Sequence, residues 1–142
     1  MCSYCGCLAI AMIARLTDEH TAIVNSAGLL RRAAAEGDES AAATAAKALE
    51  SLLHPHTATE ERALFAELRR DSEFTAHVDA LCAEHHTIDD LLTQVLRGDL
   101  GEVEALARLL RRHIDKEENG VFPAAAIALD GAAWDRVDLL GQ

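Results

Sequence analysis

Apolar residues recur every three or four positions along four long stretches of the chain, which is the spacing of one face of an α-helix. We expect helices over about 18–36, 40–70, 73–97 and 101–118, joined by short loops that include Gly37 and Gly98. Short loops place consecutive helices antiparallel and side by side. The pattern therefore predicts an all-α fold, an up-down-up-down four-helix bundle with a short C-terminal helix that starts near Pro123.

Local signals set the expected ends of these helices. Thr17, followed by two acidic residues, is a good N-cap for the first helix, and Ser72 is one for the third. Pro55 lies inside the second helix and predicts a kink, because proline removes one backbone hydrogen bond. Gly120 and Pro123 are expected to end the fourth helix.

Polar residues interrupt the apolar face of each helix at one level. A histidine stands on every face, and on two faces a glutamate follows one helical turn later, so that both side chains point the same way. Burying two carboxylates in a core is costly unless positive charge compensates them. Two metal ions would supply that charge, and the predicted ligands are His20, His56, Glu60, His85, His113 and Glu117.

Imidazole with carboxylate is a donor set that suits iron, manganese or zinc. Six ligands are too few to saturate two six-coordinate ions individually, but Glu60 and Glu117 could each bridge the pair. Bridging would leave positions for an oxo or hydroxo bridge and for one outside ligand. We therefore expect two iron ions with room for a small ligand such as dioxygen, peroxide or nitric oxide.

The motifs that contain these residues resemble the hemerythrin-like (HHE cation-binding) family over roughly residues 16–125. They are Asp18-Glu19-His20, His56-Thr-Ala-Thr-Glu60-Glu61, Glu84-His85 and His113-Ile-Asp-Lys-Glu117-Glu118-Asn-Gly-Val-Phe122-Pro123. The resemblance implies an up-down-up-down bundle that holds a non-haem di-iron centre.

Two positions depart from the oxygen-carrying hemerythrins. Those proteins have a second histidine one turn along the third helix, where this chain has Asp89, and their last carboxylate would be Glu118 rather than Glu117. The chain is more similar to the four-His, two-Glu variant found in iron-sensing and iron-centre-repair relatives. This departure disfavours simple reversible oxygen carriage and favours a site that is more open to reactive chemistry.

Several polar residues flank the predicted ligands. Asp89 could be a seventh, weaker ligand or could accept a hydrogen bond from His85 beside the site, and we favour the second role. Glu61, Glu84 and Glu118 are rotated by about 100° from the neighbouring ligands and are expected to be solvated. Residues expected away from the site are the surface histidines His54, His77 and His86, and Cys82, which is expected to pack in the core.

The chain begins with a cysteine-rich leader that contains Cys2, Cys5 and Cys7. Three thiols this close together could bind an additional zinc, copper or iron ion, or form a redox pair. A tail whose thiols only buffer oxidation is the alternative. We divide the chain into this leader at 1–15, the bundle at 16–130 and a tail at 131–142.

Charge and composition exclude several classes of partner. The formal net charge is −11, from 13 basic and 24 acidic residues, and arginine pairs lie on separate helices, so we expect no nucleic-acid binding. The longest apolar run, at 8–14, is too short for a membrane span and lacks the basic leader of a signal peptide. We therefore expect a cytoplasmic protein.

Three functions are compatible with these residues. An open di-iron site that handles peroxide, nitric oxide or dioxygen is the favoured one, and a peroxide- or nitric-oxide-consuming oxidoreductase would be its enzymatic form. The alternatives are a non-enzymatic sensor or store of dioxygen, nitric oxide or iron, and an iron donor for the repair of iron centres. A ferritin-like oxidase is disfavoured, because that class spaces glutamate and histidine by three residues in the opposite order.

Overall fold

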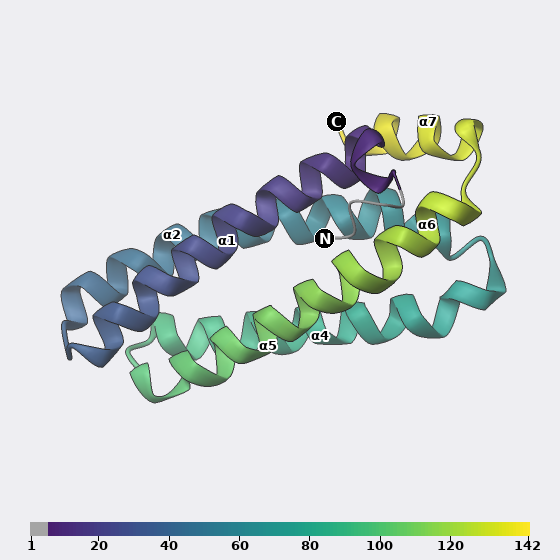
Figure 1. Ribbon diagram of the computed structural model, residues 1–142. Coiled ribbons are helices and arrows are strands. Elements are labelled where there is room, and N and C mark those ends of the chain that lie inside the picture. The colour runs from purple at the N-terminus through teal and green to yellow at the C-terminus, as the bar shows by residue number, and fades with distance from the viewer. Residues whose placement is uncertain (1–5) are drawn as a thin grey trace.

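A computed structural model describes the backbone of residues 6–142 and confirms the all-α four-helix bundle (Figure 1). Consecutive helices run in opposite directions, and each packs against two others, so that α1 contacts α2, α2 contacts α4, α4 contacts α5, and α5 contacts α1. The bundle helices are α1 (Ala11–Ala35), α2 (Glu39–Thr59), α4 (Ser72–Leu96) and α5 (Val103–Lys116).

Two of these helices continue through a wider π-helical turn. Helix α2 passes through η2 (Glu60–Phe65) into α3 (Ala66–Leu68), and α5 passes through η4 (Glu117–Val121) into α6 (Phe122–Ala128). Such turns often occur at functional sites, and here each begins at a predicted glutamate ligand. Short 3₁₀ turns, η1 (Cys7–Ala9) and η3 (Leu100–Glu102), precede α1 and α5.

The buried residues form two hydrophobic clusters separated by a polar layer. One cluster, around Phe65 and Phe122, fills the end of the bundle that α7 covers. The other, around Leu30, Leu49 and Leu92, fills the end near the α1–α2 and α4–α5 turns. The buried histidines and glutamates belong to neither cluster, so the polar layer crosses the bundle between them.

The hairpin turns and caps follow the expected chemistry. Gly37 and Gly98 adopt φ values of 69° and 103° after α1 and α4, a region that favours glycine. Asp38 caps α2 by accepting a hydrogen bond from the backbone N–H of Ala41. Asp71, rather than the predicted Ser72, caps α4, because its side chain accepts from the backbone N–H of Glu73.

Two predicted helix ends are wrong. Helix α1 begins at Ala11 rather than at the Thr17 cap, because the added turns bury Met12 and Ile13, which are at most 4% exposed. Gly120 and Pro123 do not end the fourth helix, which stays helical to Ala128. The wide π turn before Pro123 gives its ring the room that a regular α-helix would deny it.

Residues 131–142, predicted as a tail, contain helix α7 (Gly131–Leu140). Asp130 caps α7 by accepting from the backbone N–H of Ala133. Val137 is fully buried in the cluster around Phe65. Side chains from the bundle also hold the helix: Arg136 pairs with the buried Glu67, Arg62 donates to Leu140 O at 2.7 Å, and Arg15 donates to Gly141 O at 2.7 Å.

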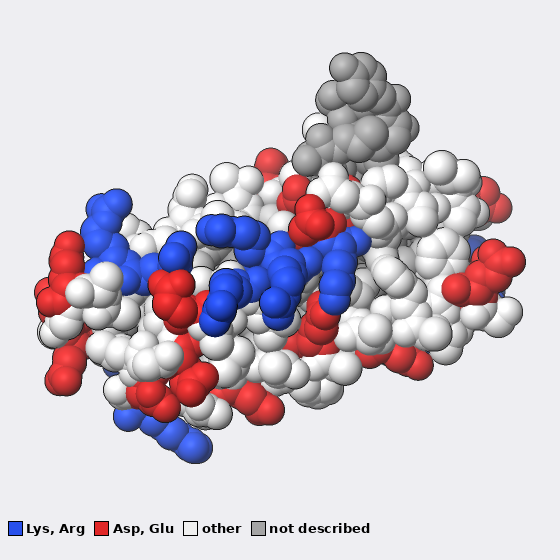
Figure 2. Space-filling model, turned by 60° about the horizontal axis from the view of Figure 1, so that its bottom comes forward, with Lys and Arg blue, Asp and Glu red and all other residues white. Residues whose placement is uncertain are grey.

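Charge is unevenly distributed over the surface. Figure 2 shows basic side chains gathered in the middle of one face, with acidic side chains among and around them. Helix α5 exposes Arg108, Arg111, Arg112 and Lys116. Lys116 pairs with Glu84 from α4. Among residues 6–142, no helix is long and apolar enough to cross a membrane.

If α7 is part of the packed core, Val137→Ala lowers the free energy of unfolding by about 2 kcal/mol, through the lost methyl groups and the cavity they leave. Leu139→Ala is the matched control on the same helix, because Leu139 is 68% exposed and its truncation costs less than about 0.5 kcal/mol. Urea-induced unfolding followed by circular dichroism measures both. Equal, small effects would show that α7 is a loosely attached tail.

Candidate metal centre

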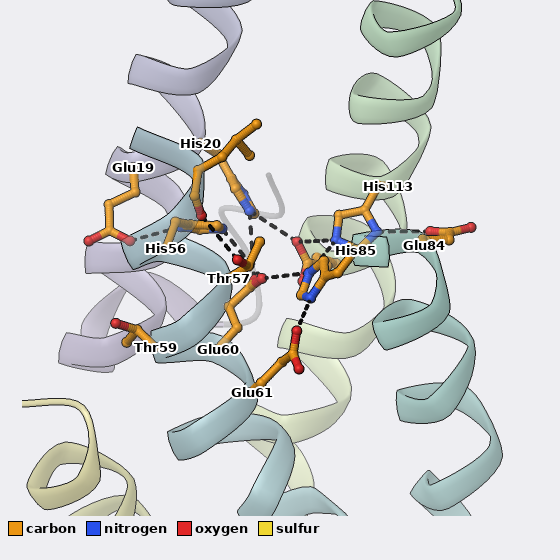
Figure 3. A network of polar contacts seen from close by, with 12 residues as sticks. Glu19, His20, His56, Thr57, Thr59, Glu60, Glu61, Glu84, His85 and His113 are labelled. Carbon is orange, nitrogen blue, oxygen red and sulfur yellow. Dashed lines mark hydrogen bonds and ion pairs between the residues drawn. The ribbon is translucent and has the colours of Figure 1, made fainter. Parts of the chain in front are cut away.

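The structure brings the six predicted ligands together in the polar layer (Figure 3). Their donor atoms form two groups, and within each group all atoms lie within 4.8 Å of one another. His20 and His56 belong only to the first group, whereas His85 and His113 belong only to the second. Glu60 and Glu117 belong to both groups, which is the arrangement that two bridging carboxylates require.

Interatomic distances support this sharing. Glu60 Oε1 lies 3.4 Å from His56 Nε2 and 3.2 Å from His85 Nε2. Glu117 Oε1 lies 3.0 Å from His20 Nε2 and 3.4 Å from His113 Nε2. Each carboxylate therefore faces one histidine of each group. One of these histidines lies on the same helix as the carboxylate, and the other lies on a different helix.

The donor atoms are buried and poorly satisfied by the protein itself. Glu60 and Glu117 are 0% exposed, and none of their four carboxylate oxygens has a hydrogen-bond partner; neither does His20 Nε2. His85 Nε2 and His113 Nε2 face each other at 3.0 Å. Unpartnered buried carboxylates are strongly destabilising, so donors that converge on shared points fit metal cations. The residues present therefore fit a pair of ions.

A second set of carboxylates surrounds the histidines; we call it the carboxylate ring. Each member is half-buried and contacts Nδ1 of one histidine, at 2.7–2.8 Å. The pairs are Glu19 with His56, Glu61 with His85, Glu84 with His113 and Glu118 with His20.

The carboxylate ring determines which nitrogen of each histidine is available. An ionised carboxylate only accepts hydrogen bonds, so each Nδ1 carries a proton and donates it. The Nε2 atoms are then the ones free to bind a metal, and all four point into the centre. Such contacts orient a ligating imidazole and raise its basicity. Glu61, Glu84 and Glu118 are therefore not the freely solvated residues that the sequence predicts.

The ring links every helix of the bundle to the next. Glu19 of α1 contacts α2, Glu61 of η2 contacts α4, Glu84 of α4 contacts α5, and Glu118 of η4 contacts α1. Every ring glutamate is also the direct neighbour of a candidate ligand in the sequence. Each helix thus supplies one histidine to the centre and positions the histidine of its neighbour.

This pattern reveals an internal repeat that is longer than the repeated ligand pair. The two histidine pairs have the same geometry, with ring centroids 4.7 Å apart in both and interplanar angles of 57° and 56°. In each half a π turn supplies a glutamate shared by both donor groups and a ring glutamate, and a phenylalanine lies at the end of that turn (Phe65) or directly after it (Phe122). The repeated order is Glu19-His20, His56, Glu60-Glu61, Phe65 in the first half and Glu84-His85, His113, Glu117-Glu118, Phe122 in the second.

The two phenylalanines close one side of the centre. Phe122 stacks on His20 with centroids 5.7 Å apart, and Phe65 stacks on His85 with centroids 5.9 Å apart. Both phenylalanines are fully buried. Each histidine so covered is also the one that the same π turn holds through its ring glutamate, so a single turn fixes both the tilt and the rotation of the imidazole.

The opposite side of the centre faces an apolar void. Its walls are the four candidate histidine ligands together with Ile23, Leu53, Thr57, Ile88, Leu110 and Ile114. The void leaves about 10 Å³ for the centre of a water-sized molecule, which is close to the minimum that holds one water. An outside ligand at the centre would therefore be a small one, bound on this side.

Asp89 does not take the predicted place beside His85. Its Oδ1 lies 3.0 Å from His54 Nε2, and both side chains are exposed. Asp89 is rotated by about 40° from the direction of His85, being four residues later on the helix, and this offset turns it toward α2. The other surface histidines, His77 and His86, are exposed as expected.

The cysteine prediction lies mostly outside the described part of the chain. Cys2, Cys5 and the side chain of Cys7 are not described. Within the described residues, the candidate metal-binding groups contain only histidine and glutamate. Cys82 is half-buried, and burial raises the pKa of its thiol, which disfavours the reactive thiolate form.

Electrostatics couples the centre to the ring. Burial alone would lower the pKa of His56, but Glu60 and Glu19 raise it to about 10. Similarly, Glu117 is the main influence that overcomes burial and raises the pKa of His113 to about 9. The hydrogen bond from His56 in turn holds the pKa of Glu19 below its ordinary value. Burial, reinforced by the charge of Glu60, raises the pKa of Glu117.

These pKa values predict that metal and protons compete for the site. Values of about 10 for His56 and about 9 for His113 lie above the ordinary 6.5, so the metal-free folded protein holds both protons at pH 7. Ligation needs the free Nε2, so loading with Mn²⁺ at pH 7 releases protons, and affinity rises with pH until about 9 to 10. Calorimetric titration in buffers of different ionisation enthalpy measures the release. An affinity that is independent of pH from 6.5 to 9 would contradict this assignment.

The carboxylate ring is tested by comparing Glu61 with Asp89. Glu61→Ala removes the partner of His85 Nδ1 and is expected to weaken metal binding by about 10- to 100-fold, whereas Glu61→Gln keeps an acceptor and has a smaller effect. Asp89→Ala is the control, and we expect unchanged metal affinity because the Asp89 side chain pairs with the exposed His54 and not with a candidate ligand. Equilibrium dialysis against Mn²⁺ measures all three. A larger loss of metal affinity in Asp89→Ala than in Glu61→Ala would instead support Asp89 as the hydrogen-bond partner of His85.

Comparison with known proteins agrees with this geometry. The family model described as "Hemerythrin HHE cation binding domain" matches residues 11–125, which contain all six candidate ligands and the whole carboxylate ring. Searches of the curated proteins and of the solved structures gave no match. The matched residues cover most of the chain and coincide with the bundle that holds the His/Glu cluster. The chain therefore belongs to the hemerythrin HHE cation-binding family.

Proposed function

We propose that the chain binds two iron ions and handles a small oxidant, namely peroxide, nitric oxide or dioxygen, at an open position beside them. One ion would be held by His20 and His56, the other by His85 and His113, and both by Glu60 and Glu117. Iron so bound would supply Lewis acidity and exchangeable electrons for reaction with such a ligand.

One observation carries the proposal: the centre is closed on one side and free on the other. Phe65 and Phe122 cover the closed side, while the free side opens into the void lined by Ile23, Leu53 and Ile88. A ligand there is kept from bulk water and meets no charged side chain other than those of the centre. The apolar lining favours small, uncharged molecules over hydrated ions.

The protein's own groups would keep such a site intact during reaction. The ring glutamates hold each imidazole through Nδ1, so a histidine cannot rotate away while the ligand binds. Arg15 and Lys116 pair with Glu19 and Glu84 in turn. His56 is thus connected through Glu19 to the cation of Arg15. In the same way, His113 is connected through Glu84 to the cation of Lys116.

A non-enzymatic sensor or store of dioxygen, nitric oxide or iron is the alternative, and an iron donor for centre repair is a further one. The small void is compatible with binding one molecule without turnover. The number of oxidant equivalents consumed separates these functions. A store binds one equivalent per centre, a donor loses its iron to an apo-acceptor, and an oxidoreductase consumes many equivalents and keeps its iron.

The test is consumption of hydrogen peroxide or nitric oxide by the iron-loaded protein, with the iron content measured before and after. Glu60→Gln removes a shared ligand, and we expect iron content and consumption to fall by at least about tenfold, since changes beside a metal site already cost about that much. Glu36→Gln, an exposed glutamate at the end of α1, is the matched control and should match the unmodified protein. Consumption no faster than that by free iron would overturn the enzymatic form of the proposal.

A further inference from the structure

A surface hollow lies directly outside the apolar void. It has a volume of about 210 Å³ and lies at the junction of α1 with α5 and η4, lined by His20, Thr21, Val24, Asn25, Ile114 and Glu118. The void inside the bundle is also lined by His20 and Ile114. These two side chains are therefore shared by the hollow and the void, and they form the wall between solvent and the centre.

The two parts of this wall are held very differently. His20 is tied by its hydrogen bond to Glu118 at 2.7 Å and by stacking on Phe122. Ile114 is half-buried and aliphatic, and only packing holds it. Its side chain can change rotamer without breaking a hydrogen bond, so Ile114 is the part of the wall that can move aside.

The internal repeat provides a comparison with the opposite side of the bundle. Thr57 follows His56 as Ile114 follows His113, and Asp89 follows His85 by four residues as Val24 follows His20. At that second junction, between α2 and α4, Asp89 pairs with His54 across the surface. Thr57 also donates its hydroxyl to Leu53 O at 3.1 Å. The Thr57 hydrogen bond stays within α2 and holds that side chain in one rotamer, whereas the Ile114 side chain makes no hydrogen bond. The Asp89–His54 pair further covers the second junction, where the equivalent position at the first junction is the aliphatic Val24.

We propose that small uncharged ligands reach the centre between α1 and α5, and that Ile114 sets the size of the ligand that can pass. Val24 forms an apolar rim, 43% exposed, and Glu118 is the one charged side chain of the hollow. Molecules with two or three non-hydrogen atoms need only a rotamer change of Ile114, while larger ones require the helices to separate. This inference rests on the proposed metal centre and adds the route by which its ligand enters.

The test is the rate at which nitric oxide binds the ferrous-loaded protein, followed by stopped-flow absorption. Ile114→Phe narrows the wall, and we expect the association rate to fall about tenfold; Ile114→Ala should raise it. Thr57 also lines the void, so Thr57→Phe and Thr57→Ala are the matched comparison from the second junction, and each should change the rate clearly less than the same substitution at Ile114. Metal content and thermal unfolding of each variant show whether it has folded and loaded normally.

A second readout needs no metal. Dissolved dioxygen broadens the methyl NMR resonances that it approaches, so in the metal-free protein that of Ile114, which borders both the hollow and the void, should broaden more than that of Thr57, which borders the void alone. Equal effects of the Ile114 and Thr57 substitutions, together with equal broadening, would overturn the route. A centre that binds no nitric oxide in any variant would instead contradict the proposed function, while the broadening would still report on the route.

Discussion

Two carboxylates buried without hydrogen-bond partners are the constraint on which the rest of this structure depends. Glu60 and Glu117 lie fully inside the bundle, between two hydrophobic clusters, at a place where negative charge is very costly. Four imidazole nitrogens point at the same two groups of carboxylate oxygens, where protons or metal ions can compensate the negative charge. The family's cation-binding character follows from this balance, because cations shared by both carboxylates offset their charge most directly.

The carboxylate ring extends this balance from the centre to the surface. Each ring glutamate is joined to a ligand on the neighbouring helix, so the four contacts close around the bundle and join all the helices at one level. A change at one member would therefore alter both a ligand and the packing of two helices. The internal repeat explains how a short chain builds this arrangement: the same helical hairpin, with its π turn and phenylalanine, is used twice.

The sequence predicted the bundle and its six inward donors because both depend on helical periodicity alone. The carboxylate ring could not be found in that way, because Glu61, Glu84 and Glu118 are rotated away from their own ligands and reach histidines on another helix. Their contacts depend on how neighbouring helices are placed, which no spacing within one helix records. The start of α1 and the continuation through Pro123 were missed for a related reason, since tertiary burial of Met12, Ile13 and Phe122 outweighs local caps and breakers. The repeated Glu-His and Glu-Glu neighbours were the available signal for the ring.

The most direct test of the central claim is a crystal structure of the iron-loaded protein, with anomalous diffraction recorded on both sides of the iron absorption edge. The account predicts two iron peaks, one among His20, His56, Glu60 and Glu117 and the other among Glu60, His85, His113 and Glu117. It also predicts that every histidine ligates through Nε2 while Nδ1 stays bonded to the carboxylate ring. A single peak, or a centre in which protonated histidines neutralise Glu60 and Glu117 without metal, would contradict it.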